Sequence, residues 1–258
     1  MSDPVKVRTE NEIGHILLNR PQKRNSLSTD LIGALTQALK DMNQNDEVKV
    51  IILSGEGKDF CAGGDLESLK GFASPSDIRH YMEAATNLTQ LLLNLDKLVI
   101  SAVHGSAAGA GFSIALASDF IVADDSAKFR LSFANIGIMP DLGLMKLLSE
   151  RVPLALAKEW IVTGAVLTAY EAKSFGIINR FVEGDVLHEA VTFAKQIGNG
   201  APLSQKYVKY MLNHRKDADW ETVLQHEIMI QTFLMQTDDH NEAVQAFFEK
   251  RSPVFIGR

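Results

Sequence analysis

Two glycine-rich segments hold the residue types best suited to chemistry. The first, Phe60–Leu66, reads Phe-Cys-Ala-Gly-Gly-Asp-Leu and follows the apolar run Val50–Leu53. Consecutive small residues let a backbone approach a ligand closely, and N–H groups at such a turn can stabilise negative charge, as an oxyanion hole does. A tight strand-to-helix turn capped by Asp65 would use the same residues, so both interpretations stay open. Cys61 is interpreted as a small buried residue, because no base stands beside it in the sequence.

The second segment, His104–Gly111, reads His-Gly-Ser-Ala-Ala-Gly-Ala-Gly and follows the apolar run Leu98–Val103. Its glycines suggest the dinucleotide fingerprint G-x-G-x-x-G, but Ile114 stands where the third glycine belongs, which argues against that motif. A helix N-terminus opened by small residues is still a favourable place for anionic charge. His104 is assigned no catalytic role.

The elements that must position these segments alternate along the chain. Val5–Asn19 predicts two short strands around Asn11-Glu12, and Ser28 is a candidate N-cap for the helix that follows. That helix has an apolar stripe of Leu31, Leu35, Leu39 and Met42. Buried strands are predicted at Val50–Leu53, Leu98–Ile100 and Phe120–Ala123. Strands that alternate with helices indicate an α/β fold with a largely parallel sheet.

The second half of the chain is mostly helical. Thr168 and Glu171 form a capping box, and Gly176 is a stop signal for that helix. One more strand is predicted at Ile177–Val182, and only helices from about Pro202 onward. The helix at Trp220–Gln236 is apolar on several faces, which is typical either of an internal helix or of a subunit interface.

The composition narrows the function classes. The chain has 258 residues, 46% apolar and 22% charged, which predicts one folded body with a large core. A net charge of -6 without a basic cluster disfavours nucleic-acid binding. One cysteine excludes an internal disulfide, and the histidines show no metal-ligand spacing, so no structural metal is expected. With no signal-peptide core and no apolar run of about 20 residues, we expect a cytoplasmic protein without membrane segments.

The order and separation of several motifs resemble the crotonase superfamily, also called the enoyl-CoA hydratase/isomerase family. The resemblance covers essentially the whole chain. It rests on Leu18–Pro21 with Asn25–Leu27, Phe60–Leu66, Gly105–Asp119, Ile136–Asp141 and Lys250–Phe255. The sequence is especially similar to the isomerases of the phenylacetyl-CoA ring-epoxide pathway, through Ser126–Phe129, Gly137–Asp141 and Lys250–Phe255.

This resemblance implies a fold and a substrate class. Residues 1–200 would form the crotonase spiral of β-β-α turns, and residues 201–258 a helical region that assembles a homotrimer or a hexamer. The substrate would be an acyl-CoA thioester. The resemblance implies no separate cofactor, because coenzyme A arrives as part of the substrate, and neither nucleic acid nor membrane is an expected partner.

The resemblance also assigns the site. The backbone N–H groups of Gly64 and Ala110 would form the oxyanion hole for the thioester carbonyl. Further substrate-binding positions are Ala62, Asp65, Leu66, Gly109 and Phe133. The adenine would lie near the loop with Lys23 and Arg24, and Lys250 would reach a CoA phosphate, from its own or a neighbouring subunit.

Side chains at three positions select the reaction. Family hydratases activate water with two glutamates, and those positions hold Ser113 and Phe133, neither of which is a general base near neutral pH. Family isomerases carry an acid/base at the position of Asp141. Local sequence alone favours a different interpretation, in which Asp141 is the N-cap of a helix at Leu142–Leu148, and the resemblance shifts the balance toward an acid/base. An apolar pocket with Phe133 and Met139 would desolvate its carboxylate and favour proton uptake.

The leading hypothesis is therefore an enoyl-CoA isomerase, in which Asp141 moves a proton from C2 to C4 of the acyl group. The alternative is an enoyl-CoA hydratase of fatty-acid or aromatic-acid degradation. A third hypothesis makes Asp141 a nucleophile, as in the aryl-CoA dehalogenases of the family, although no helper base is identified. The fourth, from a different class, is an acyl-CoA-binding or scaffolding protein without turnover.

Overall fold

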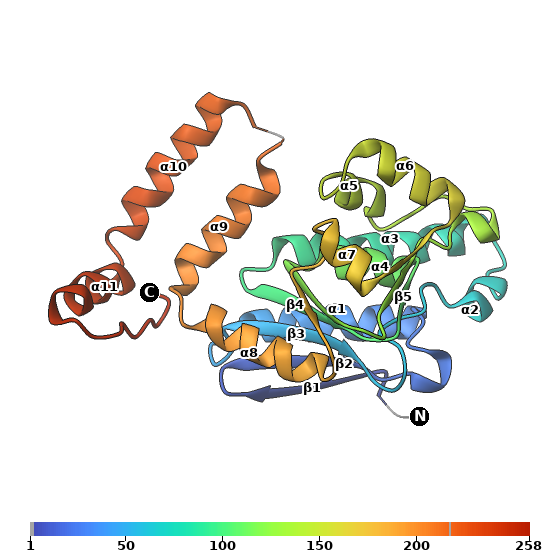
Figure 1. Cartoon of the computed structure of the whole chain (residues 1–258), viewed down its shortest axis with the longest axis horizontal. Coiled ribbons are helices and arrows are strands. Elements are labelled where there is room, and N and C mark those ends of the chain that lie inside the picture. Colours follow the sequence, from blue (N-terminus) through green and yellow to red (C-terminus); the bar gives the residue numbers. More distant parts are fainter. Residues whose placement is uncertain (1–2, 217) are drawn as a thin grey trace.

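Two sheets of unequal size organise the chain (Figure 1). The computed structural model describes residues 3–216 and 218–258. The larger sheet has the order β1 (Val5–Glu10), β2 (Ile13–Leu18), β3 (Val50–Gly55), β4 (Leu98–Val103), β6 (Phe120–Asp124) and β9 (Arg180–Val182). Only the β1–β2 pair within it is antiparallel. The smaller sheet contains β5 (Ser106–Ala108), β7 (Lys128–Arg130) and β8 (Val166–Thr168). The predicted α/β class with a largely parallel sheet is confirmed.

Helices cover both faces of the larger sheet and form the C-terminal end. They are α1 (Thr29–Gln44), α2 (Leu66–Lys70), α3 (Pro75–Asn94), α4 (Ala110–Ala117), α5 (Leu144–Ser149), α6 (Leu154–Thr163), α7 (Ala169–Ser174), α8 (Val186–Gly198), α9 (Pro202–His214), α10 (Trp220–Leu234) and α11 (Asp238–Glu249), with 3-10 turns η1 (Pro21–Lys23) and η2 (Ala134–Ile136). Two predicted caps are confirmed. The Ser28 hydroxyl accepts from the N–H of Leu31 at 3.2 Å, and Thr168 and Glu171 form a reciprocal capping box.

The central strands divide their side chains between two cores, because successive residues of a strand point to opposite faces. Ile51 and Leu53 of β3 belong to the large core, which includes residues of α1, α3 and α4. Val50 and Ile52 belong to a second core against α8. The parallel pairing of β3 with β4 carries this alternation across the sheet.

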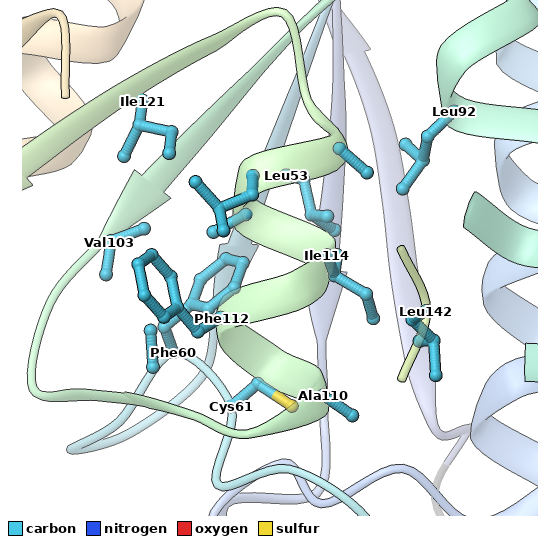
Figure 2. Packing of buried hydrophobic residues seen from close by; sticks show 14 of the residues in the cluster. Leu53, Phe60, Cys61, Leu92, Val103, Ala110, Phe112, Ile114, Ile121 and Leu142 are labelled. Carbon is cyan, nitrogen blue, oxygen red and sulfur yellow. The ribbon is translucent and has the colours of Figure 1, made fainter. Parts of the chain in front are cut away.

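Helix α4 is buried along its whole length. Figure 2 shows Phe112 on one side of this helix and Ile114 on the other, each packed among apolar side chains. The helix also approaches the first glycine-rich segment closely. A Cβ atom at Gly111 would lie 2.8 Å from the Cβ atom of Cys61, so this contact requires glycine.

The structure differs from the sequence-based prediction in one strand boundary and in several short strands. The strand predicted at Ile177–Val182 begins only at Arg180, and the buried Ile177 and Ile178 precede it. The sequence does not predict the three-residue strands β5, β7 and β8, because so short a segment shows no alternation that distinguishes a strand from a loop.

Helices α9, α10 and α11 extend from one end of the body (Figure 1). The helix predicted at Trp220–Gln236 is confirmed as α10, but its interpretation as an internal helix is wrong. None of its residues is buried in the single chain, and Ile228 is 60% exposed. The subunit-interface interpretation stays a prediction. Across residues 3–216 and 218–258, no helix is long and apolar enough to cross a membrane.

A buried ion pair attaches α9 to the body. The ammonium group of Lys209 donates to Asp119 Oδ2 at 2.8 Å and to the carbonyls of Leu92 and Lys97 at 3.0 and 3.2 Å. Asp119 also accepts from the N–H of Val99 at 2.7 Å. Burial raises the pKa of Asp119, and the nearby Lys209 charge opposes that shift. The ion pair is therefore needed to compensate a buried carboxylate.

Replacing Lys209 by methionine should lower the free energy of unfolding by about 3–5 kcal/mol, because it leaves Asp119 buried without its partner. Urea denaturation at pH 7 measures this loss. Lys206→Met is the matched control, since Lys206 forms an exposed ion pair with Asp96 at 3.0 Å, and such a pair contributes under about 1 kcal/mol. Equal losses for both variants would contradict the anchoring role of Lys209.

Candidate active site

The first glycine-rich loop is held along one edge by Leu27. The N–H of Leu27 donates to the carbonyl of Gly63 at 2.7 Å, and the N–H of Asp65 donates to the carbonyl of Leu27 at 3.1 Å. These two hydrogen bonds form a parallel bridge between Leu27 and Gly64. In such a bridge the hydrogen-bonding groups come from the residues on either side of Gly64, which are Gly63 and Asp65. The N–H of Gly64 itself therefore points to the opposite side of the loop.

The second loop ends at the N-terminus of α4. Gly109 is the N-cap, and its N–H donates to the carbonyl of Arg130 at 2.9 Å. Ala110 is the first helical residue, so its N–H has no acceptor within the helix. The two loops are joined by a parallel bridge between Cys61 and Ala107. The backbone N–H of Cys61 donates to the carbonyl of Ser106 at 3.0 Å, and the N–H of Ala108 donates to the carbonyl of Cys61 at 2.9 Å.

The two loops line the same cavity, which has a volume of about 310 Å³. Its described lining residues are Leu27, Ala62, Gly63, Gly64, Leu66, Leu69, Tyr81, Met82, Ala85, Gly109, Ala110, Ser132, Phe133, Asn135, Ile136, Ile138, Asp141 and Leu142. Among these residues Asp141 is the only carboxylate. The cavity is thus lined by the two backbone segments that contain Gly64 and Ala110 and by one acidic side chain.

Asp141 is a desolvated carboxylate. Among the described residues, no group donates a hydrogen bond to its buried Oδ1 atom. Burial raises the pKa of Asp141 from its ordinary value of 3.8 to about 6. This combination of a cavity position and a raised pKa is typical of a functional acid or base.

The interpretation of Asp141 as a helix N-cap is wrong. Helix α5 begins at Leu144, its N-cap is Gly143, and that cap makes no side-chain hydrogen bond. Leu142 and Gly143 both have positive φ values, 50° and 78°, which delay the start of the helix. Asp141 contacts the start of this helix through its backbone carbonyl, which accepts from the N–H of Leu144 at 3.0 Å, and not through its carboxylate. The carboxylate is left to face the cavity.

The two positions that the resemblance predicts for the hydratase glutamates, Ser113 and Phe133, carry no acid. Phe133 lines the cavity and is 4% exposed. Ser113 is fully buried in α4, with its hydroxyl 3.3 Å from the carbonyl of Gly109 and 3.2 Å from that of Asp141. Ser113 thus contacts the backbone of the acidic residue without supplying a base of its own.

The other sequence-predicted positions in this region divide into two groups. Ala62, Leu66 and Gly109 line the cavity. Asp65 does not, because its carboxylate caps α2 through the N–H groups at the start of that helix and forms an ion pair with Arg20 at 2.9 Å. The interpretation of Asp65 as a cap is therefore confirmed.

The three predicted basic residues lie outside the cavity lining of the single chain. Lys23 pairs with Glu67 at 2.7 Å, and Arg24 pairs with both carboxylate oxygens of Asp59 at 2.8 and 3.1 Å. The carbonyl of Arg24 accepts from the N–H of Ala62, so this segment borders the first loop. Lys250 ends α11, in the helical extension of Figure 1.

Sequence reasoning missed two hydroxyl groups of α3. Tyr81 lines the cavity and donates to the carbonyl of Leu27 at 2.8 Å, and Thr89 donates to the carbonyl of Leu142 at 3.2 Å. Burial, and next the charge of Asp141, raise the pKa of Tyr81, so its hydroxyl remains a donor. In the sequence, both residues follow the apolar periodicity of a core-facing helix, which gives no sign of a site.

Comparisons with known proteins identify one enzyme family. The family described as enoyl-CoA hydratase/isomerase matches residues 8–258. A carnitinyl-CoA dehydratase from Salmonella typhi is 34% identical, with 100% of each chain covered. A trans-2-decenoyl-[acyl-carrier-protein] isomerase from Streptococcus mutans is 29% identical, with 96% of each chain covered.

Solved structures confirm the predicted crotonase fold. An enoyl-CoA hydratase from Polaromonas sp. JS666 superposes with a TM-score of 0.94 at 32% identity, covering 97% of this chain and 99% of its own. An enoyl-CoA hydratase from Bacillus anthracis superposes equally well, at 31% identity and with 99% and 100% coverage.

The raised pKa of Asp141 predicts a cost to stability. Because the folded-state pKa lies above the ordinary value of 3.8, the folded state holds the proton more tightly than the unfolded state does. The associated stability is present below pH 3.8 and is lost as the pH rises through about 6. The change in the free energy of unfolding caused by Asp141→Asn should therefore be more favourable at pH 8 than at pH 4.5. The expected difference is about 1–2 kcal/mol, because partial solvent exposure of Asp141 reduces the effect.

Urea denaturation of both proteins at the two pH values, at one protein concentration, measures this difference. Glu47→Gln is a control on an exposed side chain. A difference between wild type and Asp141→Asn that does not change with pH would show that Asp141 titrates normally.

Proposed function

The chain belongs to the enoyl-CoA hydratase/isomerase family, and from this premise we propose that it is an enoyl-CoA isomerase. One observation carries the proposal. The cavity that contains the two backbone donor segments has a single carboxylate, Asp141, among its described lining residues. One acid/base is sufficient to move a double bond by way of an enolate, whereas activation of water by the two-glutamate route needs a second.

The proposed reaction shifts a double bond from C3–C4 to C2–C3 of a CoA thioester. The N–H groups of Gly64 and Ala110 donate to the thioester oxygen. The ionised Asp141 takes a proton from C2, and the electron pair of that C–H bond becomes part of a dienolate whose negative charge lies on the bound oxygen. Collapse of the dienolate returns the proton from Asp141 to C4. The base is regenerated and no co-reactant is consumed.

The pKa of Asp141 suits this cycle. At about 6, it leaves the carboxylate mostly ionised near neutral pH, yet it makes the carboxylate a stronger base than an ordinary aspartate. No separate cofactor enters the proposed cycle, because coenzyme A is part of the substrate.

Enoyl-CoA hydration is the alternative function. It is favoured by the likeness to solved structures described as enoyl-CoA hydratases. The present cavity argues against it, because Ser113 and Phe133 occupy the two glutamate positions. The two reactions are distinguished by their products from 2-enoyl-CoA and 3-enoyl-CoA.

Assembly into a trimer or hexamer is part of the same proposal. Helix α10 exposes Leu224, Ile228, Met229 and Phe233, each by 47% or more. Large apolar side chains grouped on one helix favour a covered surface. Assembly would also bring residues of the C-terminal extension, Lys250 among them, near another subunit.

We expect the protein to sediment as an oligomer at micromolar concentration, with Ile228→Asp shifting the distribution toward smaller species. The reason is that a charge at 60% exposure in the monomer would become buried and unpaired in the assembly. Analytical ultracentrifugation gives the mass directly. A wild-type monomer at this concentration would refute the interface.

Asp141→Asn should lower kcat for isomerisation of 3-enoyl-CoA by about 10²- to 10⁴-fold while leaving affinity for the thioester nearly unchanged. For the wild type, kcat/KM should fall as the pH drops through about 6, because protonated Asp141 cannot accept the C2 proton. Chromatographic identification of the products, with initial rates from pH 5 to 9, tests both statements.

Glu83→Gln, on the exposed face of α3, is the control for removal of a carboxylate. Near-normal turnover by Asp141→Asn would show that Asp141 is not the base of the reaction. Rapid conversion of 2-enoyl-CoA to 3-hydroxyacyl-CoA by the wild type, without isomerisation of 3-enoyl-CoA, would favour the hydratase. Tight thioester binding with no turnover of either substrate would favour the acyl-CoA-binding protein.

A further inference from the structure

Helix α3 contacts two parts of the candidate site through buried hydroxyl groups: the segment bridged to Gly64 and the segment that contains Asp141. Tyr81 and Thr89 are 7% and 5% exposed and lie eight residues apart, which is about 12 Å along the helix at 1.5 Å per residue. Each donates to a backbone carbonyl more than 50 residues away in the sequence, Leu27 for Tyr81 and Leu142 for Thr89.

The Tyr81 contact reaches the first glycine-rich loop. The carbonyl of Leu27 accepts from the Tyr81 hydroxyl at 2.8 Å and from the N–H of Asp65 at 3.1 Å. That second hydrogen bond belongs to the bridge that directs the N–H of Gly64 away from Leu27. Tyr81 thereby holds the Leu27 backbone, which is bridged to Gly64 and orients it. The ring also lines the cavity, and its hydroxyl would lie 3.5 Å from a Cβ atom at Gly64.

The Thr89 contact reaches the acidic segment. The Thr89 hydroxyl donates to the carbonyl of Leu142, the residue that follows Asp141, at 3.2 Å. Leu142 has a φ value of 50°, a left-handed conformation that is unfavourable for a residue with a side chain and persists only where neighbours hold it. Ser113 on α4 contacts the carbonyl of Asp141 itself. The backbone around the carboxylate is thus held by α3 and α4 together.

We propose that α3 sets the separation between the carboxylate of Asp141 and the N–H of Gly64, with Tyr81 and Thr89 as positioning residues. This inference rests on the proposed function, which gives those two groups their roles. In an isomerase the same carboxylate must reach both C2 and C4 while the thioester oxygen stays bound. A shift of a fraction of an ångström between base and donor is therefore costly to the rate.

The test removes each hydroxyl without changing the shape of the side chain. Tyr81→Phe, Thr89→Val and the double variant are compared with Tyr170→Phe and Thr192→Val. Tyr170 is 73% exposed, and Thr192 makes a hydroxyl-to-carbonyl hydrogen bond within α8, on the other face of the sheet. The readouts are kcat and KM for 3-enoyl-CoA, exchange of the C2 protons of butyryl-CoA in D2O, and the thermal midpoint of unfolding.

Each positioning variant should lower kcat and the C2 exchange rate about tenfold, with KM changed by less than about twofold. The double variant should lose less than the product of the two single effects, because either change already releases the same spacing. The control variants should keep wild-type rates.

A thermal midpoint that falls while kcat and exchange stay at wild-type values would overturn the inference and leave both hydroxyls with a structural role only. A rise in KM with unchanged kcat would also overturn it, since that result reports substrate binding. If the wild type exchanges C2 protons but does not isomerise 3-enoyl-CoA, the proposed isomerase fails, while loss of exchange in the variants would still support the positioning role.

Discussion

The parallel bridge between Cys61 and Ala107 is the contact on which the candidate site depends. Its hydrogen bonds of 3.0 and 2.9 Å hold the first glycine-rich loop against the second. The approach is close enough that Gly111 at the start of α4 cannot carry a side chain, because a Cβ atom would collide with Cys61. This contact brings Gly64 and Ala110, which belong to segments far apart in the sequence, to the lining of one cavity.

In the cavity between these loops, the buried oxygen of the Asp141 carboxylate has no hydrogen-bond donor among the described residues. Burial raises the pKa of Asp141 to about 6. A fold selected for stability alone would replace such a group, because an unpaired buried carboxylate is costly. Its neighbours instead hold its backbone through Ser113 and, one residue on, through Thr89. The arrangement fixes the position of the base while leaving its oxygens available.

The C-terminal extension combines a firm attachment with an uncovered surface. The ammonium group of Lys209 on α9 donates to the buried Asp119 and to two carbonyls, so the first helix of the extension is tied to the end of α3 and to the starts of β4 and β6. The next helix, α10, has no buried residue. An anchored helix pair with an exposed apolar face would suit the proposed assembly, because a fixed orientation lowers the entropy cost of binding a second subunit.

The sequence by itself determined the features that depend on near neighbours. The alternation of apolar runs and helical segments gave the α/β class, and the caps at Ser28 and at Thr168 with Glu171 were readable because each cap bond spans three residues. The order of the motifs identified the family. Tertiary structure decided that Asp141 is not a cap, because left-handed residues after it delay α5. It also decided that Tyr81 and Thr89 contact the site, since their hydrogen bonds span 54 and 53 residues. A hydroxyl on the apolar stripe of a helix carries no local signal of its partner, and only the packing of α3 against the segments at Leu27 and Leu142 shows which carbonyls these hydroxyls contact.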